Sequence, residues 1–155
     1  MKRKLACFLA ALALLATAGC AAKGAAVSID VGKTADSIAK TVKFSDQMSA
    51  VDQKTAEKLF GLDSGTVVSA KAYESTGATA EEVAAFEAKD EASEKQIAAA
   101  VKKRVENQKA AFKDYQPKEM TKLQNPLIVE KGNYVFLCVA DDPTPAQKAI
   151  DQAAK

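Results

Sequence analysis

The sequence of 155 residues contains no histidine and no tryptophan, and aromatic residues make up only 6% of it. Without histidine the chain lacks the commonest general base of enzymes, and His-containing zinc sites and histidine-based triads are excluded. The formal net charge is only +2, whereas a dedicated nucleic-acid-binding protein has a strongly basic face. We therefore expect no nucleic-acid partner. The length is sufficient for one folded domain and too short for two.

The N-terminus has the parts of an export signal. Residues 2–4 are Lys-Arg-Lys, and the run from Leu5 to Ala16 carries no polar side chain except the thiol of Cys7. This run is shorter than the roughly 20 apolar residues that a membrane-spanning helix needs, and it has the length of a signal-peptide core. Residues 1–19 are therefore predicted to be a signal peptide.

Cys20 follows small residues, and Ala18-Gly19-Cys20 resembles the lipobox of bacterial lipoproteins. There the cysteine thiol receives a diacylglyceryl group, and the peptide is cut immediately before the cysteine. The lipobox usually has leucine where this chain has Thr17. The alternative is secretion of a soluble protein, because Ala16-Thr17-Ala18 also fits the A-x-A pattern of the general signal peptidase. We expect lipid attachment at Cys20, on the outer face of the cytoplasmic membrane.

Removal of residues 1–19 makes the chain nearly neutral. That segment holds three of the 22 basic residues and no acidic residue, so 19 basic and 20 acidic residues remain, a net charge of −1. Without a basic patch, membrane attachment depends on lipid. Two acyl chains, at about 0.8 kcal/mol per buried CH₂, bind stably where one chain does not. The membrane partner is therefore expected to be reached through the diacylglyceryl group on Cys20.

Four segments are predicted along the chain. Residues 1–19 are the signal peptide, and residues 20–30 are the lipidated cysteine and a short tether. Residues 31–142 are a single folded domain, and residues 143–155 are a C-terminal tail or weak helix.

Cys138 is expected to be the free thiol that remains after Cys7 leaves with the signal peptide and Cys20 receives lipid. A lone thiol cannot form an internal disulfide, so the fold must rest on its apolar core. The neighbours Leu137 and Val139 are typical of a buried strand, and free cysteine is among the most buried residue types. We interpret Cys138 as a core residue.

Two short helices are predicted in the first part of the domain. The segment near 33–42 has its apolar residues on one helical face. The next helix begins after Asp52, which can cap its N-terminus, and ends before Gly61, which suits a left-handed C-terminal turn.

A long helix is predicted over about 93–115. Ser93 and Gln96 form a capping box, and Pro117 prevents clean continuation. The helix carries one stripe at helical spacing, formed by Ile97, Val101, Val105, Gln108, Phe112 and Tyr115.

Strands are predicted after and before this helix. Leu127–Val129 and Tyr134–Val139 are β-prone, and the Gly132-Asn133 pair between them suits a hairpin turn. The second run is apolar on both faces, as in a central strand. Residues 67–73 are a further strand candidate. Residues 82–88 are either a strand or part of a helix that continues into the long one.

Several short segments also occur in a familiar order. They are Gly61-Leu62-Asp63, Ser75 to Phe86, Arg104 with Gln108-Lys109, Tyr115 to Glu119, Lys122-Leu123 and Gly132 to Val135. Together they resemble an uncharacterised lipoprotein family of Gram-positive bacteria, which carries a domain of unknown function, DUF4358. The resemblance covers roughly Val31 to Asp142. It implies a lipid-anchored extracytoplasmic domain and favours the strand at 82–88, but it implies no activity.

The expected fold is α+β. A mainly antiparallel sheet of about four strands has the long helix packed on it, with shorter helices towards the N-terminus.

The sequence assigns no catalytic, cofactor-binding or metal-binding residue. The acidic residues near the start of the long helix lack the spacing and central glycine of a calcium loop. Gly32-Lys33-Thr34 lacks the first glycine of a phosphate-binding loop and is interpreted as a helix start. A candidate recognition loop is formed by Ser75, Thr76 and Gly77, because recognition concentrates in loops on rigid scaffolds.

Two functions are weighed on this basis. The first is a binding or structural module for an unknown extracytoplasmic protein or small ligand. The alternative is an enzyme without histidine that uses carboxylates such as Glu82, Asp90 or Asp142. A cleft in which two carboxylates converge would favour catalysis, and an apolar or mixed patch would favour binding.

Overall fold

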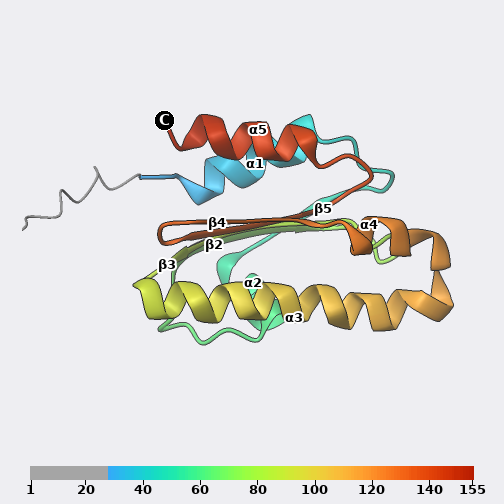
Figure 1. The fold of residues 1–155 in the computed structure, drawn as a ribbon, viewed down its shortest axis with the longest axis horizontal. Helices are drawn as coiled ribbons and strands as arrows, with labels where there is room; N and C mark the ends of the chain where they lie inside the picture. Colours follow the sequence, from blue (N-terminus) through green and yellow to red (C-terminus); the bar gives the residue numbers. More distant parts are fainter. Residues whose placement is uncertain (1–27) are drawn as a thin grey trace, which may run out of the picture.

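A five-stranded antiparallel sheet forms the middle layer of the structure, a computed structural model that describes residues 28–155 (Figure 1). The predicted signal peptide and Cys20 lie outside these residues. The strand order is β1-β2-β3-β5-β4. The strands are β1 (Ser49–Val51), β2 (Val67–Glu74), β3 (Glu82–Ala88), β4 (Leu127–Lys131) and β5 (Tyr134–Val139).

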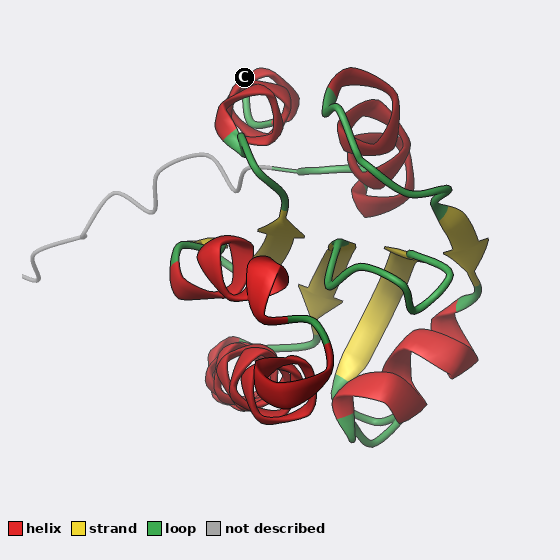
Figure 2. Ribbon diagram, turned by 90° about the vertical axis from the view of Figure 1, so that its right-hand side faces the viewer, coloured by secondary structure: helices red, strands yellow, loops and turns green. Residues whose placement is uncertain are grey.

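Helices cover both faces of this sheet, as the view in Figure 2 shows. They are α1 (Val31–Thr41), α2 (Gln53–Phe60), α3 (Glu91–Tyr115), α4 (Met120–Gln124) and α5 (Thr144–Ala153), with a short 3₁₀ turn η1 (Pro117–Glu119) before α4. α1 and α5 lie on one face, and α2 and α3 lie on the other (Figure 1). The predicted α+β class is confirmed, with five strands in the described residues where about four were expected. The additional strand is β1, whose three residues are too few to show a sequence pattern.

The predicted hairpin is formed by β4 and β5. Lys131 pairs with Tyr134, so Gly132 and Asn133 form a two-residue turn. Gly132 has a φ of 59°, the positive value that such a turn requires. β5 lies between β3 and β4, and all six of its residues are buried. The prediction of a central strand is therefore confirmed.

Residues 82–88, for which the sequence allowed either a strand or a helix, form strand β3. β3 pairs with β2 on one side and with β5 on the other. Val83 and Ala85 pack on the α1 side of the sheet, while Ala84 and Phe86 pack on the α3 side. Alternate burial on two faces is the pattern of a strand, so the helix reading is wrong. Tertiary packing overrides the local helix preference of this alanine-rich segment.

The sheet separates two apolar cores in the described residues. The α3-side core includes Phe60, Phe86, Ile97, Val101, Leu123, Val135 and Leu137. The α1-side core includes Ile38, Val83, Phe136, Cys138 and Ile150. Burial raises the pKa of the Cys138 thiol to about 12. Cys138 is thus a free, buried core thiol, as predicted.

The limits of α2 agree with the sequence prediction. The Asp52 carboxylate accepts a hydrogen bond from the backbone N–H of Thr55 at 2.8 Å. Gly61 ends the helix in the left-handed region, with a φ of 65°.

The end of α3 at Tyr115 agrees with the prediction, but its start and the burial of its last turn differ. The N-cap is Asp90, whose carboxylate accepts a hydrogen bond from the backbone N–H of Ser93 at 2.8 Å. The capping box at Ser93 is therefore wrong, because the carboxylate of Asp90 already binds the exposed donors of the first turn. Tyr115, expected on the buried stripe, is 67% exposed. A helix of 25 residues is about 37 Å long, whereas the eight residues of β2 span about 26 Å, so the last turns project past the sheet.

Packing also includes residues outside the predicted domain limits of 31–142. Ile29, in the predicted tether, is 3% exposed and belongs to the α1-side core. Ile150, in the predicted tail, is buried in the same core, where α5 packs beside α1.

Candidate functional site

A cavity of about 360 Å³ lies between the β2–β3 loop and the C-terminal half of α3. Its volume is in the range of small-molecule sites, about 300–1,000 Å³. The side chains and backbone that line it are Glu74, Ser75, Gly77, Thr79 and Glu81 from the sheet side, and Arg104, Asn107, Gln108, Ala111 and Phe112 from α3. Two residues of the candidate recognition loop, Ser75 and Gly77, are thus in the cavity wall, while Thr76 is beside it.

Hydrogen bonds hold the β2–β3 loop in place. The Ser75 hydroxyl donates to the carbonyl oxygen of Thr79 at 2.6 Å. The backbone N–H of Thr76 donates to the carboxylate of Asp46 at 2.9 Å. Gly77 has a φ of 93°, a conformation that glycine adopts without steric cost. The loop is therefore attached both to itself and to the segment between α1 and β1.

Arg104 joins two carboxylates at one wall of the cavity. Its Nε donates to Glu82 at 3.1 Å, and its terminal Nη2 donates to Glu74 at 2.9 Å. Glu74 and Glu82 are directly opposite each other in β2 and β3, so one guanidinium reaches both. The guanidinium carbon also lies 5.9 Å from the centroid of the Phe60 ring. Arg104 is thus held in a defined position by the sheet and by α2.

Glu82 is the most deeply buried member of this group, with 1% of its surface exposed. Burial raises the pKa of Glu82 to about 8; the positive charge of Arg104 opposes this rise, and the neighbouring Glu74 carboxylate adds to it. At neutral pH the folded protein therefore holds Glu82 mainly in its protonated form. With Glu82 protonated, the positive charge of Arg104 and the negative charge of Glu74 cancel, so the three side chains together carry no net charge.

Gln108, a residue of the cavity wall, carries an unpartnered acceptor. Its Oε1 atom is buried and has no hydrogen-bond partner among residues 28–155. A buried polar atom without a partner costs about 1–3 kcal/mol, and native structures contain few of them. The terminal torsion of glutamine has no sharp preference, so a turn of the Gln108 amide would bring this buried oxygen to a hydroxyl or N–H group of a ligand in the cavity.

A second buried ion pair lies beside the cavity. Lys122 Nζ is 2.9 Å from Glu81 Oε1, and the two side chains are 5% and 0% exposed. Glu81 also accepts hydrogen bonds from the backbone N–H groups of Ser45 and Asp46 at 2.9 and 3.0 Å. Burial opposes the ionisation of Glu81, but these donors and Lys122 hold its pKa below the ordinary value.

The contacts of Lys122 show a structural role for this pair. The ammonium also contacts Glu119 at 3.1 Å. Burial disfavours the charged amine, but the hydrogen bonds to Glu81 and Glu119 raise the pKa of Lys122 above its ordinary value. The ion pair thus attaches α4 to the start of β3 and leaves both groups occupied. No feature of the sequence indicated it, since its members are 41 residues apart.

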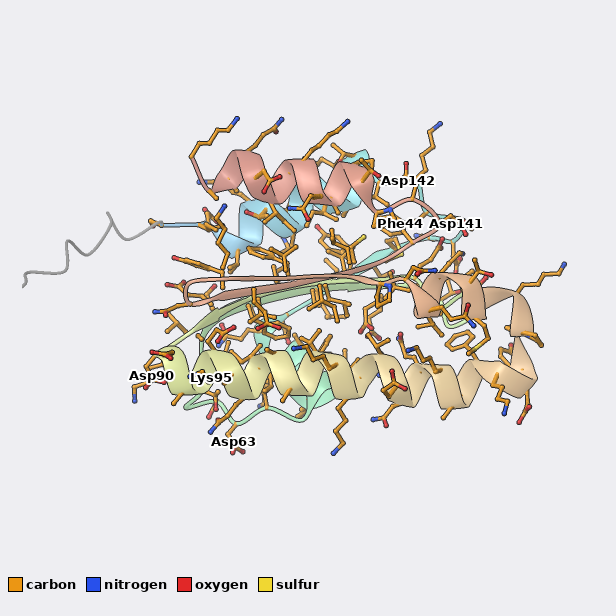
Figure 3. All side chains as sticks on the ribbon, in the orientation of Figure 1. Phe44, Asp63, Asp90, Lys95, Asp141 and Asp142 are labelled. Atoms are coloured by element: carbon orange, nitrogen blue, oxygen red, sulfur yellow. The ribbon has the colours of Figure 1, made fainter. Side chains whose placement is uncertain are left out.

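The three carboxylates considered for catalysis do not meet. Asp90 caps α3, and Asp142 accepts a hydrogen bond from the backbone N–H of Thr144 at 3.0 Å, at the start of α5. Figure 3 shows Asp90 and Asp142 at opposite ends of the molecule. Glu82 is buried elsewhere, beside Arg104. The carboxylates that do converge are Glu74 and Glu82, and no pattern in the sequence indicated Glu74.

The acidic residues before and within the first turn of α3 also separate. Glu81 pairs with Lys122, Glu82 pairs with Arg104, and Glu91 pairs with Lys95 at 2.7 Å. In the part of the chain that the structure describes, no group of three or more cysteine or acidic side chains is arranged to hold a metal ion.

Comparison with protein families shows one match, and the cavity lies within it. The family model described as "Domain of unknown function (DUF4358)" matches residues 40–140. The chain belongs to the DUF4358 family. Every residue that lines the cavity lies inside the DUF4358 match, whereas α5 and nearly all of α1 lie outside it. No curated protein and no solved structure matches the chain.

The description of the DUF4358 family assigns no activity. Any function of the cavity therefore follows from the side chains that line it. In the described range 28–155, the helices are too short or too polar to cross a membrane.

Proposed function

We propose that this DUF4358 protein is a membrane-anchored extracytoplasmic binding module that holds a small polar ligand in the cavity between the β2–β3 loop and α3. The observation that carries the proposal is this cavity, whose wall includes Gln108 with its unpartnered side-chain oxygen. Donors from Arg104 and an apolar surface from Phe112 line the same space. A few fixed polar groups beside an aromatic surface are the usual composition of a ligand site.

The arrangement of the two ends supports presentation of the cavity away from a membrane. The described chain begins at the left of Figure 1, and α4 lies at the right. The β2–β3 loop is at the α4 end, because Glu81 pairs with Lys122. Ser28 is only eight residues after Cys20, so a lipid on Cys20 would keep the left end near the bilayer. The cavity would then face outward.

A matched pair of variants tests binding in this cavity. Ala111 lines the cavity and its neighbour Ala110 does not, although both are exposed on α3. The full chain, purified in a polyoxyethylene detergent, is screened by ligand-observed NMR against a library of sugars, amino acids, short peptides, amines and organic acids. We expect compounds that bind the wild type and Ala110→Phe but not Ala111→Phe. If no compound distinguishes the two variants, the binding function is wrong.

A second candidate function is an enzyme without histidine. The observation in its favour is the convergence of Glu74 and Glu82, of which the buried Glu82 is protonated at neutral pH and Glu74 lines the cavity. Two carboxyl groups in different protonation states are the usual acid and base of glycoside hydrolysis. Arg104 occupies both carboxylates, however, and Glu82 is outside the cavity lining, so binding is the first candidate. If the protein is an enzyme, incubation with a compound that binds must release a product. The Glu74→Gln variant must then fail to release it.

A further inference from the structure

The charged side chains in and beside the first cavity already take part in ion pairs. Glu74 is paired with Arg104, and Glu81 is paired with Lys122. A charged ligand would meet both signs at once and would have to compete with ion pairs that the folded chain already contains. The wall therefore favours a ligand without net charge.

The hydrogen-bonding groups in the wall are of both kinds, donors and acceptors. Gln108 Oε1 needs a donor, while Asn107 and Arg104 offer N–H groups. Arg104 uses Nε and Nη2 for its two carboxylates, which leaves N–H groups of the guanidinium for a ligand. Hydroxyl groups both donate and accept hydrogen bonds, so a polyhydroxylated ligand matches this mixture.

An aromatic pair stands beside these polar groups. Phe112 lines the cavity, and its ring centroid is 6.3 Å from that of Tyr115. Tyr115 is 67% exposed, so most of its surface is free to contact a ligand beside the cavity. The C–H face of a sugar ring is apolar and packs against aromatic rings, while its hydroxyl groups point to the sides. Planar polar side chains next to aromatic rings therefore match a sugar.

A second cavity lies beside the first. Its volume is about 240 Å³, it is lined by Lys58, Phe60, Gly61 and Lys103 among others, and it shares Arg104 and Asn107 with the first. The two spaces thus follow α3 on either side of the same two residues. A chain of sugar units can occupy both, whereas a single unit can occupy only one.

A bound peptide strand has no free backbone to pair with at this place. Glu74 in β2 is already paired with Ser49 on one side and with Glu82 on the other. Addition of a strand to a sheet requires an unpaired edge, and the cavity wall lacks one here. The backbone arrangement thus argues for side-chain recognition.

We infer that the cavity binds an uncharged oligosaccharide, with Gln108 accepting from a sugar hydroxyl, Arg104 donating to another, and the Phe112 and Tyr115 rings against a C–H face. This inference rests on the proposed binding function, because it concerns the ligand of the same cavity.

The test uses the full chain in a polyoxyethylene detergent, which has no sugar headgroup to compete. Maltotriose, triacetylchitotriose, their monosaccharides glucose and N-acetylglucosamine, and trialanine are titrated by calorimetry and by saturation-transfer NMR. We expect at least one trisaccharide to bind, and to bind more tightly than its monosaccharide. Trialanine is expected not to bind. If neither trisaccharide binds, or if trialanine binds in their place, the inference is overturned.

Two variants connect this binding to the cavity. Gln108→Ala removes the acceptor and is expected to weaken trisaccharide binding about fivefold, the value of one ordinary hydrogen bond. It should fold, because it deletes an unpartnered atom. The control is Gln96→Ala, an exposed glutamine near the other end of α3, which is expected to leave binding unchanged. Equal affinities for the two variants would overturn the inference.

The two proposals fail in different ways. If compounds other than sugars distinguish Ala111→Phe from Ala110→Phe, the cavity is a binding site and only the carbohydrate class is wrong. If nothing in the library distinguishes those variants, both proposals are wrong.

Discussion

Arg104 of α3 and Glu82 of β3 are joined by a hydrogen bond of 3.1 Å from Nε to Oε1, and Glu82 is almost completely buried. The contact crosses from the helix layer to the middle strand of the sheet. It also fixes the guanidinium that faces the cavity. Stability and its pH dependence are therefore coupled at this one point, beside the proposed binding cavity.

Loss of the arginine should destabilise the fold. Arg104→Met leaves Glu82 buried without its donor, which we expect to cost about 1–3 kcal/mol in the free energy of unfolding. The control is Lys102→Met, because Lys102 pairs with Glu130 on the exposed side of the same helix, and such a pair contributes about 0–1 kcal/mol. Urea unfolding followed by circular dichroism measures both. Similar losses for the two variants would contradict a special role for Arg104.

Glu82 should make stability depend on pH. Its folded-state pKa, about 8, lies above its ordinary value of 4.5, so between these values the folded protein binds a proton that the unfolded chain does not. This contribution to stability is complete below about pH 4.5 and is lost as the pH rises to 8, with a slope of at most about 1.4 kcal/mol per pH unit.

Urea midpoints measured from pH 5 to pH 8 test this dependence. The midpoint of the wild type is expected to fall as the pH rises, and the midpoint of Glu82→Gln is expected to change less. A wild-type midpoint that increases over this range, or an unchanged slope in Glu82→Gln, would show that Glu82 is ionised in the folded protein at neutral pH.

Cys20 should control attachment to the membrane. Cys20→Ser removes the thiol that would carry lipid, so the protein is expected to move from the detergent phase to the aqueous phase in a phase-partition assay. Cys7→Ser, which changes a cysteine inside the predicted signal peptide, should leave partitioning unchanged. Intact mass of the membrane-extracted protein provides a second measurement. A detergent-phase Cys20→Ser protein would contradict the lipid anchor.

Truncations along α3 should follow the burial that the structure shows. Ile97 is completely buried, and Ile97→Ala is expected to cost about 2–5 kcal/mol. Phe112 is only half-buried beside the cavity, so Phe112→Ala should cost less than Ile97→Ala. Tyr115→Ala, at the exposed end, should change the free energy of unfolding by less than about 0.5 kcal/mol. Equal costs along the stripe would show that the whole helix packs on the sheet.

Local features of the chain were predictable because their causes lie within a few residues. Asp52 and Gly61 limit α2 through one side-chain hydrogen bond and one left-handed residue. Gly132 allows the β4–β5 turn through its positive φ. The N-cap of α3 was misplaced by three residues because both Asp90 and Ser93 are good capping residues, and only the packed helix selects between them.

The cavity was predictable only in part. Ser75 and Gly77 were selected as a loop, and the structure places them in the cavity wall. Arg104 and Gln108 were noted only as members of a family pattern or of a helical stripe, because a polar residue on a half-buried helix has no local mark that separates packing from binding.

By itself the sequence determined the limits of α2, the end of α3 and the position of the hairpin, that Cys138 is buried, and that the chain carries the DUF4358 pattern, because each of these depends on neighbouring residues. Only the tertiary structure decided that Arg104 meets Glu82 and Glu74, which are 22 and 30 residues away along the chain. Strand register sets Glu74 opposite Glu82, and the packing of α3 brings Arg104 over both. Neither register nor helix placement is encoded in a local pattern, since both result from the burial of two apolar cores at once.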